Sequence, residues 1–199
     1  AMVDDAAGFQ RRAASLASTG AEILLQHADA LAAAARSEFD SAVYLGSGSR
    51  YGSAREAALK MLEMTGGGVK TLAETYLGLR HGPMSAIDDG ALVVAFLSSD
   101  ATTRAYEVDL LRELNRKRLG ARKVIVGHDV PPDLIATRDV VVDVPGLGGV
   151  NDDDAPVLDV LVGQLLAFFR CLGMGLRPDS PSEGVISRVV DDFAIHRRS

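Results

Sequence analysis

The sequence predicts an α/β protein: a three-layer α/β/α sandwich around a five-stranded parallel sheet of the flavodoxin-like kind. Segments typical of strands alternate with segments typical of helices through most of the 199 residues. The run ALVVAFL at 91–97 is apolar at every position, as expected of a parallel strand buried on both faces. A glycine-rich loop follows the first expected strand, at the sheet edge where open α/β proteins bind ligands.

The expected strands are 41–46, 69–73, 91–97, 123–127 and 139–144. Before them, apolar positions at helical spacing predict one or two helices over 7–36. Ser18, Thr19 and Gly20 indicate a local interruption or the start of a second helix there. These segments should cover one face of the sheet.

Three more helices are expected between and after the strands. The first should begin at Ser53 as its N-cap and end near Thr65, where three consecutive glycines follow. The second spans 101–118, with Ser99 or Asp100 as its capping residue. The third, 157–174, is apolar around almost its whole circumference, so we expect it in the centre of the core or in a subunit contact.

Composition indicates one soluble domain covering 1–199, with 47% hydrophobic and 24% charged residues. The net charge of −6 argues against nucleic acid as the main partner, so any bound phosphate must be held locally. Cys171 is the only cysteine, which excludes an intrachain disulfide and favours a cytoplasmic location with an inert buried thiol. No apolar run reaches about 18 residues, and no membrane partner is expected.

The glycine-rich loop is a candidate anion site. It reads Gly46-Ser47-Gly48-Ser49-Arg50-Tyr51-Gly52. Its amides precede a helix, and Ser47, Ser49 and Arg50 offer further donors to an anion or a sugar. The spacing G-x-G-x-x-x-G differs from the dinucleotide pattern, and a tight turn that needs glycine would also explain it.

Glu56, Lys60 and Glu63 lie on one stripe of the following helix, at i, i+4 and i+7. One interpretation of this stripe is a solvated helix face. The other is that it contains a general base, because a carboxylate shielded from water can remove a proton from the carbon beside a carbonyl group. His81 lies in the turn RHGP, which keeps its ring out of a regular helix. It is either structural or a proton carrier for the opening of a sugar ring.

Hydroxyl groups also follow the third expected strand, at the sheet edge where ligands bind: Ser98, Ser99, Thr102 and Thr103. The alternative is a helix N-cap, with Ser99 or Asp100 as the capping residue. No metal site and no cofactor are expected. The three consecutive carboxylates at 152–154 cannot all face one ion without a special loop, and no H-x-x-H or C-x-x-C spacing occurs.

Taken together, these parts resemble the sugar isomerase (SIS) domain, most closely the second of the two such domains in AgaS-type phosphosugar isomerases and deaminases. The segments that carry the resemblance are GSG at 46–48, EAALKMLEMT at 56–65, RHGP at 80–83, LVVAFLSSD at 92–100 and PDSPSEGVISRVV at 178–190. The resemblance implies an SIS fold, a homodimer or larger homo-oligomer, and a chain that forms the C-terminal half of a two-SIS protein.

The resemblance also implies roles for residues. Glu63 matches the family's catalytic base, with Lys60 beside it, and His81 matches a histidine that acts on the site of a neighbouring subunit. Gly46 to Ser49 would form part of the sugar cradle. Arg188 stands where synthase relatives carry a substrate-contacting lysine. The stretch LSSDATT lacks the glycine of the family's phosphate loop, which belongs to the first domain.

Three functions fit these observations. The first is an isomerase or deaminase half that acts on a phosphosugar through an enediol or enolamine. The second is a non-catalytic phosphosugar-binding regulatory module with the same pocket. The third is a dinucleotide-binding domain in which Glu74 binds ribose hydroxyls, although the glycine spacing and the RHGP turn count against it.

Overall fold

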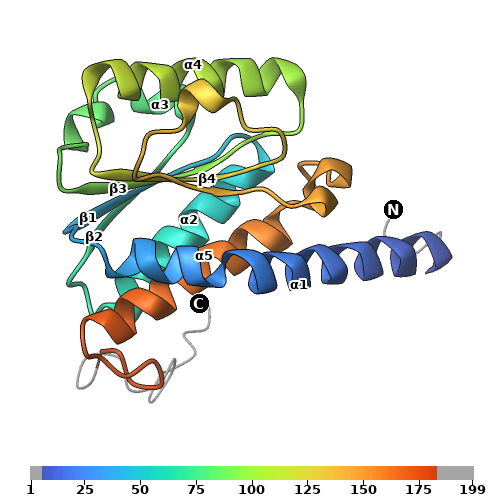
Figure 1. Ribbon diagram of the computed structural model, residues 1–199, viewed down its shortest axis with the longest axis horizontal. Coiled ribbons are helices and arrows are strands. Elements are labelled where there is room, and N and C mark those ends of the chain that lie inside the picture. Colours follow the sequence, from blue (N-terminus) through green and yellow to red (C-terminus); the bar gives the residue numbers. More distant parts are fainter. Residues whose placement is uncertain (1–5, 183–199) are drawn as a thin grey trace, which may run out of the picture.

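The protein is described by a computed structural model, which covers residues 6–182 here (Figure 1). Its sheet has five strands in the order β2-β1-β3-β4-β5, and every neighbouring pair is parallel. The strands are β1 (Ser41–Leu45), β2 (Lys70–Glu74), β3 (Ala91–Phe96), β4 (Arg122–Val126) and β5 (Val140–Val142). The predicted flavodoxin-like α/β sandwich is confirmed.

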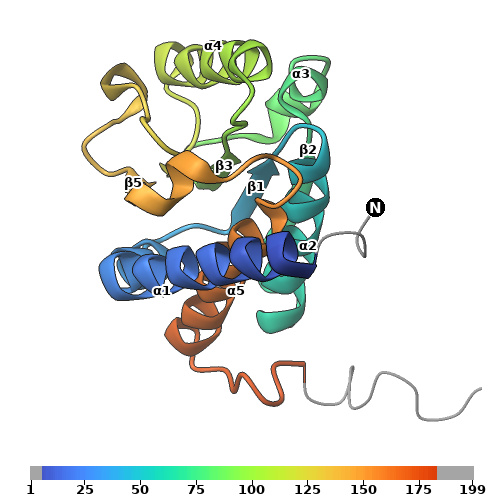
Figure 2. The same cartoon turned by 90° about the vertical axis from the view of Figure 1, so that its right-hand side faces the viewer.

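Helices cover both faces of this sheet (Figures 1 and 2). One face carries the long helices α1 (Ala6–Arg36), α2 (Ser49–Met64) and α5 (Pro156–Gly173). The other carries α3 (Tyr76–Leu79) and α4 (Ala101–Lys117). Short 3₁₀ turns complete the connections: η1 (Pro83–Ala86), η2 (Pro132–Leu134) and η3 (Pro145–Gly149). Alternate strand residues face the two layers, so Val94 packs on one side and Val93 on the other.

The N-terminal helix differs from the expectation of an interruption near Ser18, because α1 runs unbroken from Ala6 to Arg36. Thr19 and Gly20 are buried within it. The Thr19 hydroxyl donates to the Ser15 carbonyl oxygen at 3.0 Å, and Gly20 lies against the side chain of Leu161 in α5. The small residues therefore permit close helix packing and do not break the helix.

The capping residue of α2 also differs from the expectation, whereas that of α4 is one of the two expected. Helix α2 begins at Ser49 with Gly48 as its N-cap, so Ser53 is not the cap and instead lies buried one turn inside the helix. Gly48 has φ +55°, a left-handed conformation that favours glycine. For α4 the cap is Asp100, whose carboxylate accepts the amide of Thr103 at 2.8 Å.

Helix α5 lies between α1 and α2 and buries one side against the sheet layer. A Cβ on Gly163 would lie 2.5 Å from the Cβ of Ala57, so α2 and α5 touch through their smallest side chains. In the described chain, α5 is the one helix long and apolar enough to cross a membrane, yet it serves as a core helix. Its outer side leaves Val157, Phe168 and Leu172 partly exposed.

Candidate functional site

The glycine-rich loop lies at the edge of the sheet where the strands end. Glycine is required at Gly46, since a Cβ there would lie 2.3 Å from the carbonyl oxygen of Arg50. Ser47 and Gly48 line a cavity of about 350 Å³, together with Tyr76 and residues of α4. The loop is thus a tight strand-to-helix turn that also opens onto a small cavity.

Arg50 does not face this cavity. Its Nε lies 2.9 Å from Oδ2 of Asp159, and its Nη2 lies 2.7 Å from Oδ1. Both side chains are almost completely buried. Burial raises the pKa of the Asp159 carboxyl, and the two hydrogen bonds from Arg50 oppose that shift. In this structure Arg50 joins α2 to α5.

The hydroxyl groups at this edge are engaged by Asp152, from the loop that precedes α5. Its carboxylate accepts the hydroxyl of Ser98, and it accepts the amide of Ser99 at 2.8 Å and the Ser99 hydroxyl at 3.1 Å. The hydroxyl of Ser49 donates to the Asp152 backbone carbonyl at 2.6 Å. A carboxylate of the chain itself therefore occupies donors that an external anion would use.

Glu107 is a buried carboxylate at the same edge that the sequence analysis missed. Its Oε2 accepts the amide of Ser98 at 2.7 Å, while Oε1 has no hydrogen-bond partner among the described residues. Burial raises the pKa of Glu107, and it lines the cavity beside Ser47. The available signal was its place on the buried stripe of α4, in step with Leu110, Leu111 and Leu114.

Glu63 and Lys60 lie at the other end of α2. The Nζ atom of Lys60 lies 2.7 Å from Oε2 of Glu63 and 3.6 Å from Oε1 of Glu56. The hydrogen bond to Glu63 raises the pKa of Lys60, and both side chains are about one third exposed. The Ser182 hydroxyl donates to the Glu63 carbonyl oxygen at 3.2 Å, so the described chain ends beside this pair.

The predicted site residues therefore fall in separate places. Glu63 follows Ser49 by fourteen positions of one helix, which corresponds to about 21 Å at the usual helical rise. His81 is exposed after α3, on the opposite face of the sheet, where Arg80 pairs with Glu113 at 3.0 Å. Arg188 lies outside the described residues. Glu63, His81 and the glycine-rich loop do not form one site within this chain.

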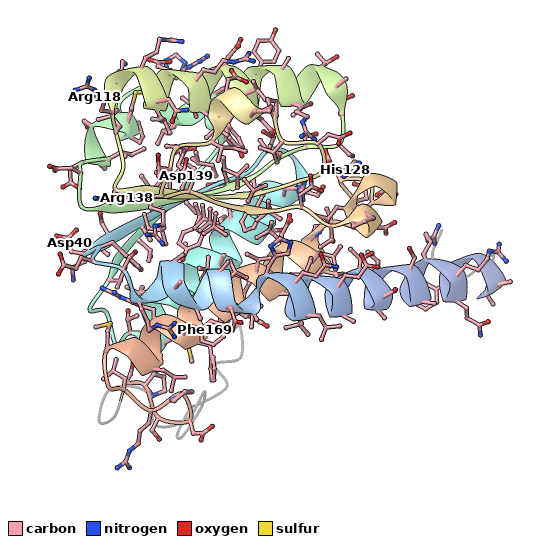
Figure 3. The ribbon with its side chains drawn as sticks, in the orientation of Figure 1. Asp40, Arg118, His128, Arg138, Asp139 and Phe169 are labelled. Carbon is pink, nitrogen blue, oxygen red and sulfur yellow. The ribbon has the colours of Figure 1, made fainter. Side chains whose placement is uncertain are left out.

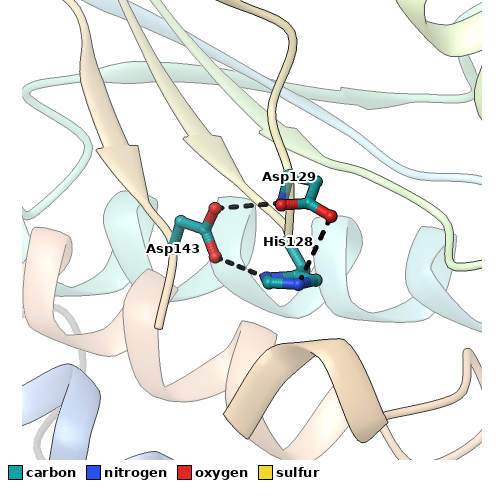
Figure 4. Close-up of side chains that lie close together, drawn as sticks. All are labelled: His128, Asp129 and Asp143. Carbon is teal, nitrogen blue, oxygen red and sulfur yellow. Dashed lines mark hydrogen bonds and ion pairs between the residues drawn. The ribbon is translucent and has the colours of Figure 1, made fainter. Parts of the chain in front are cut away.

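A second polar group that the sequence analysis missed joins the ends of β4 and β5 (Figure 4). His128 Nδ1 lies 3.0 Å from Oδ1 of Asp143, and the Asp129 amide donates to Oδ2 of Asp143 at 2.9 Å. Asp129 Oδ2 lies 3.5 Å from His128 Nε2. The hydrogen bond to Asp143 raises the pKa of His128. The group links the loops that follow β4 and β5, and we call it the His128 latch.

Glu74, which the dinucleotide hypothesis assigned to a ribose, ends the edge strand β2. Its Oε1 accepts the amide of Thr75 at 2.7 Å and lies 3.3 Å from the Thr75 hydroxyl. Its carboxylate therefore fixes the local turn into α3.

Comparison with known proteins agrees with this architecture. No family model matches the chain. The D-galactosamine-6-phosphate deaminase AgaS of Escherichia coli is 39% identical over 155 residues, which are 77% of this chain and 40% of that protein. The isomerizing glutamine–fructose-6-phosphate aminotransferase of Clostridium acetobutylicum is 33% identical over 140 residues, 69% of this chain and 21% of that protein.

Among solved structures, tagatose-6-phosphate ketose/aldose isomerase from Escherichia coli superposes with a TM-score of 0.76 at 33% identity, over 87% of this chain and 46% of that one. The chain thus spans less than half of each of these relatives. Fold and sequence together define a sugar isomerase (SIS) domain. Within that family the chain is close to the AgaS-type proteins.

Proposed function

We propose that residues 1–199 form a single SIS domain, the C-terminal half of a phosphosugar aldose-ketose isomerase or an aminosugar-6-phosphate deaminase. The AgaS deaminase and the tagatose-6-phosphate isomerase, both of which act on 6-phosphosugars by name, support the substrate class. Their lengths support the division into halves, since this chain matches 40% and 46% of them. We place the domain in the cytoplasm as an enzyme without a cofactor.

In this proposal Glu63 is the general base. Its carboxylate takes the proton from the carbon beside the substrate carbonyl, and the C–H electrons form the carbon–carbon double bond of an enediol or enolamine. The π electrons of the carbonyl group move onto its oxygen, which carries the negative charge until it is protonated. The assignment is supported by the Lys60–Glu63 contact of 2.7 Å on α2, where both side chains are about one third exposed. There Glu63 is accessible to a substrate held by another domain, and Lys60 can stabilise negative charge on the reacting oxygen.

The phosphate is then held mainly by the other half of the protein, with Gly46 to Ser49 and Ser98–Ser99 making at most secondary contacts. The bonds from Ser98 and Ser99 to Asp152 support this division, because these donors already have an acceptor. His81 serves ring opening in a neighbouring subunit, and its exposure away from Glu63 supports a role across an interface. Arg188 remains a proposed anion-binding residue.

We also propose that the chain forms a homodimer or larger homo-oligomer. The outer side of α5 and the first half of α1 enclose an apolar groove of about 750 Å³. Val157 and Phe9, which line it, are more than half exposed. Large apolar surfaces of this kind usually mark contacts between domains or subunits.

The test is deuterium exchange at C1 or C2 of a 6-phosphosugar, followed by NMR in the enzyme-competent assembly. Glu63→Gln should reduce turnover by roughly two to four orders of magnitude while leaving substrate affinity nearly unchanged. Glu56→Gln is the matched control, since it also removes a carboxylate that lies near Lys60 on the same helix. It should leave exchange nearly intact.

Exchange at the wild-type rate in Glu63→Gln would remove Glu63 from the mechanism. Absence of exchange in both proteins, with phosphosugar binding shown separately, would favour the alternative of a non-catalytic phosphosugar-binding regulatory module.

A further inference from the structure

A cavity of about 710 Å³ lies at the edge of the sheet where the strands begin, opposite the glycine-rich loop. Its walls come from the α1–β1 connection, the starts of β3 and β4, the approach to β5, and the end of α5. Figure 3 labels Asp40 and Arg138 at this edge and His128 at the other. The volume falls in the range of small-molecule sites, roughly 300–1,000 Å³.

Four arginines line this cavity, and one of them is held rigidly by the fold. The guanidinium of Arg170 donates to the carbonyl oxygens of Ala35 at 3.2 Å, Ser37 at 2.9 Å and Phe39 at 2.6 Å. It also stacks over the Phe39 ring, 4.0 Å from the ring centroid. Arg170 therefore fixes the α1–β1 connection and places a rigidly held positive charge beside the cavity.

The other three arginines, Arg36, Arg122 and Arg138, form no hydrogen bond or ion pair through their side chains with any described residue. They come from the end of α1, from β4 and from the turn before β5. The carboxylates of Glu38, Asp40 and Asp89 also line the cavity, but none forms an ion pair with these arginines. The lining thus carries four arginines against three carboxylates, in a chain whose net charge is −6.

Helix ends explain only part of this arrangement. Arg36 and Arg170 lie in the last turns of α1 and α5, where the negative end of the helix dipole stabilises a positive side chain. Arg122 and Arg138 are not at a helix end, and their charges gain nothing from it. Arg36 and Arg138 are exposed and Arg122 is half-buried, so water solvates these guanidinium groups. An anion between them replaces that water with charge-assisted hydrogen bonds and reduces their mutual repulsion.

We propose that this cavity is a binding site for a phosphate ester, separate from the site that contains Glu63. Arg122 and Arg138 bind the phosphate oxygens, for which the planar guanidinium is well suited. The carboxylates of Asp40 and Asp89 accept hydrogen bonds from hydroxyl or amino groups of the same ligand. None of these residues takes part in the proposed isomerase mechanism.

The test is calorimetric titration of the full chain with inorganic pyrophosphate and, separately, with glucose 6-phosphate, at fixed ionic strength. The wild type should bind one equivalent of either compound. Arg122→Gln and Arg138→Gln should each weaken binding about tenfold or more, because each removes charge-assisted hydrogen bonds to phosphate. Neither change should lower the thermal midpoint appreciably, since these side chains have no partner to lose.

The matched control is Arg116→Gln, which removes an equal charge from an exposed arginine on α4 that does not line the cavity. Its affinity for both compounds should stay within about twofold of the wild type, and so should that of Glu63→Gln. If Arg116→Gln weakened binding as much as Arg122→Gln and Arg138→Gln do, the binding would be due to the overall charge of the protein. That result would overturn the proposed site. Lack of binding by the wild type at millimolar concentration would overturn it as well.

Discussion

Arg50 and Asp159 form a buried two-pronged ion pair that joins the first turn of α2 to the first turn of α5. The two residues are 109 positions apart in the sequence. Because α5 also packs on α1, this one contact links the glycine-rich loop to the whole helical layer on its side of the sheet. Its main role is therefore to fix the position of α2.

Removal of one partner of this pair should be costly. Asp159→Ala removes both hydrogen bonds of the buried Arg50 guanidinium and leaves it only the longer ion pair with Asp152 at 3.9 Å, so we expect a loss of about 3–5 kcal/mol in the free energy of unfolding. The double variant Arg50→Met, Asp159→Leu should lose much less, because no charge stays buried. Urea unfolding of both proteins measures the difference. If the free energy of unfolding of Asp159→Ala lay within about 1 kcal/mol of the wild-type value, the pair would not have this role.

Asp152 should behave as an internal substitute for an anion. Asp152→Ala removes the acceptor of the Ser98 and Ser99 donors and should cost about 1–3 kcal/mol of stability. Sulfate should then raise the thermal midpoint of this variant more than that of the wild type, because the freed donors bind it. Asp153→Ala, an equal charge change in the same loop, is the control. Equal sulfate responses of the two variants would refute the idea.

His128 should make the stability dependent on pH. Its folded pKa is raised by Asp143, so the contribution is complete below the unfolded value of about 6.5 and is lost as pH rises through the folded pKa. The thermal midpoint of His128→Gln should therefore lie below that of the wild type in mild acid and approach it in mild alkali. If the difference in thermal midpoint between His128→Gln and the wild type stayed constant across pH, His128 would not stabilise the fold in this way.

The outer side of α5 should mediate self-association. We expect sedimentation of the wild type at about twice the chain mass of 21.0 kDa or more. Phe168→Glu places a charge on the partly exposed stripe of α5 and should shift the protein toward the mass of one chain. Ile135→Glu, at a similarly exposed apolar residue on the other face of the sheet, should leave the mass unchanged. A wild-type mass of one chain across micromolar concentrations would be contrary to the proposal.

Local patterns were sufficient to predict the sheet. The run 91–97 reads as a strand buried on both faces, and the observed β3 is Ala91–Phe96, buried at every position. The cap of α2 was predicted five residues too late, because Ser53 is a good capping residue by type whereas the turn at Gly46 and Gly48 fixes the start. Similarly, Gly20 looked like a helix break, yet contact with α5 keeps α1 continuous.

The site was harder to predict because its contacts join distant segments. Asp152 meets Ser98 across 54 positions, and no local pattern relates them. The separation of Ser49 from Glu63 could have been foreseen, since sixteen helical residues must place their ends apart. The buried Glu107 could also have been found from its position on an apolar helix stripe. The Arg50–Asp159 pair could not, because it depends on how α2 and α5 pack.

The bonds between Asp152 and the Ser98–Ser99 loop have a consequence for how this edge of the sheet responds to metabolites. A carboxylate tethered to the same chain acts at a high effective concentration, on the order of millimolar for a short flexible connection. A dissolved phosphate compound must exceed that level of competition before it displaces Asp152. The loop should therefore keep the same conformation whether phosphosugars are scarce or abundant in the cell.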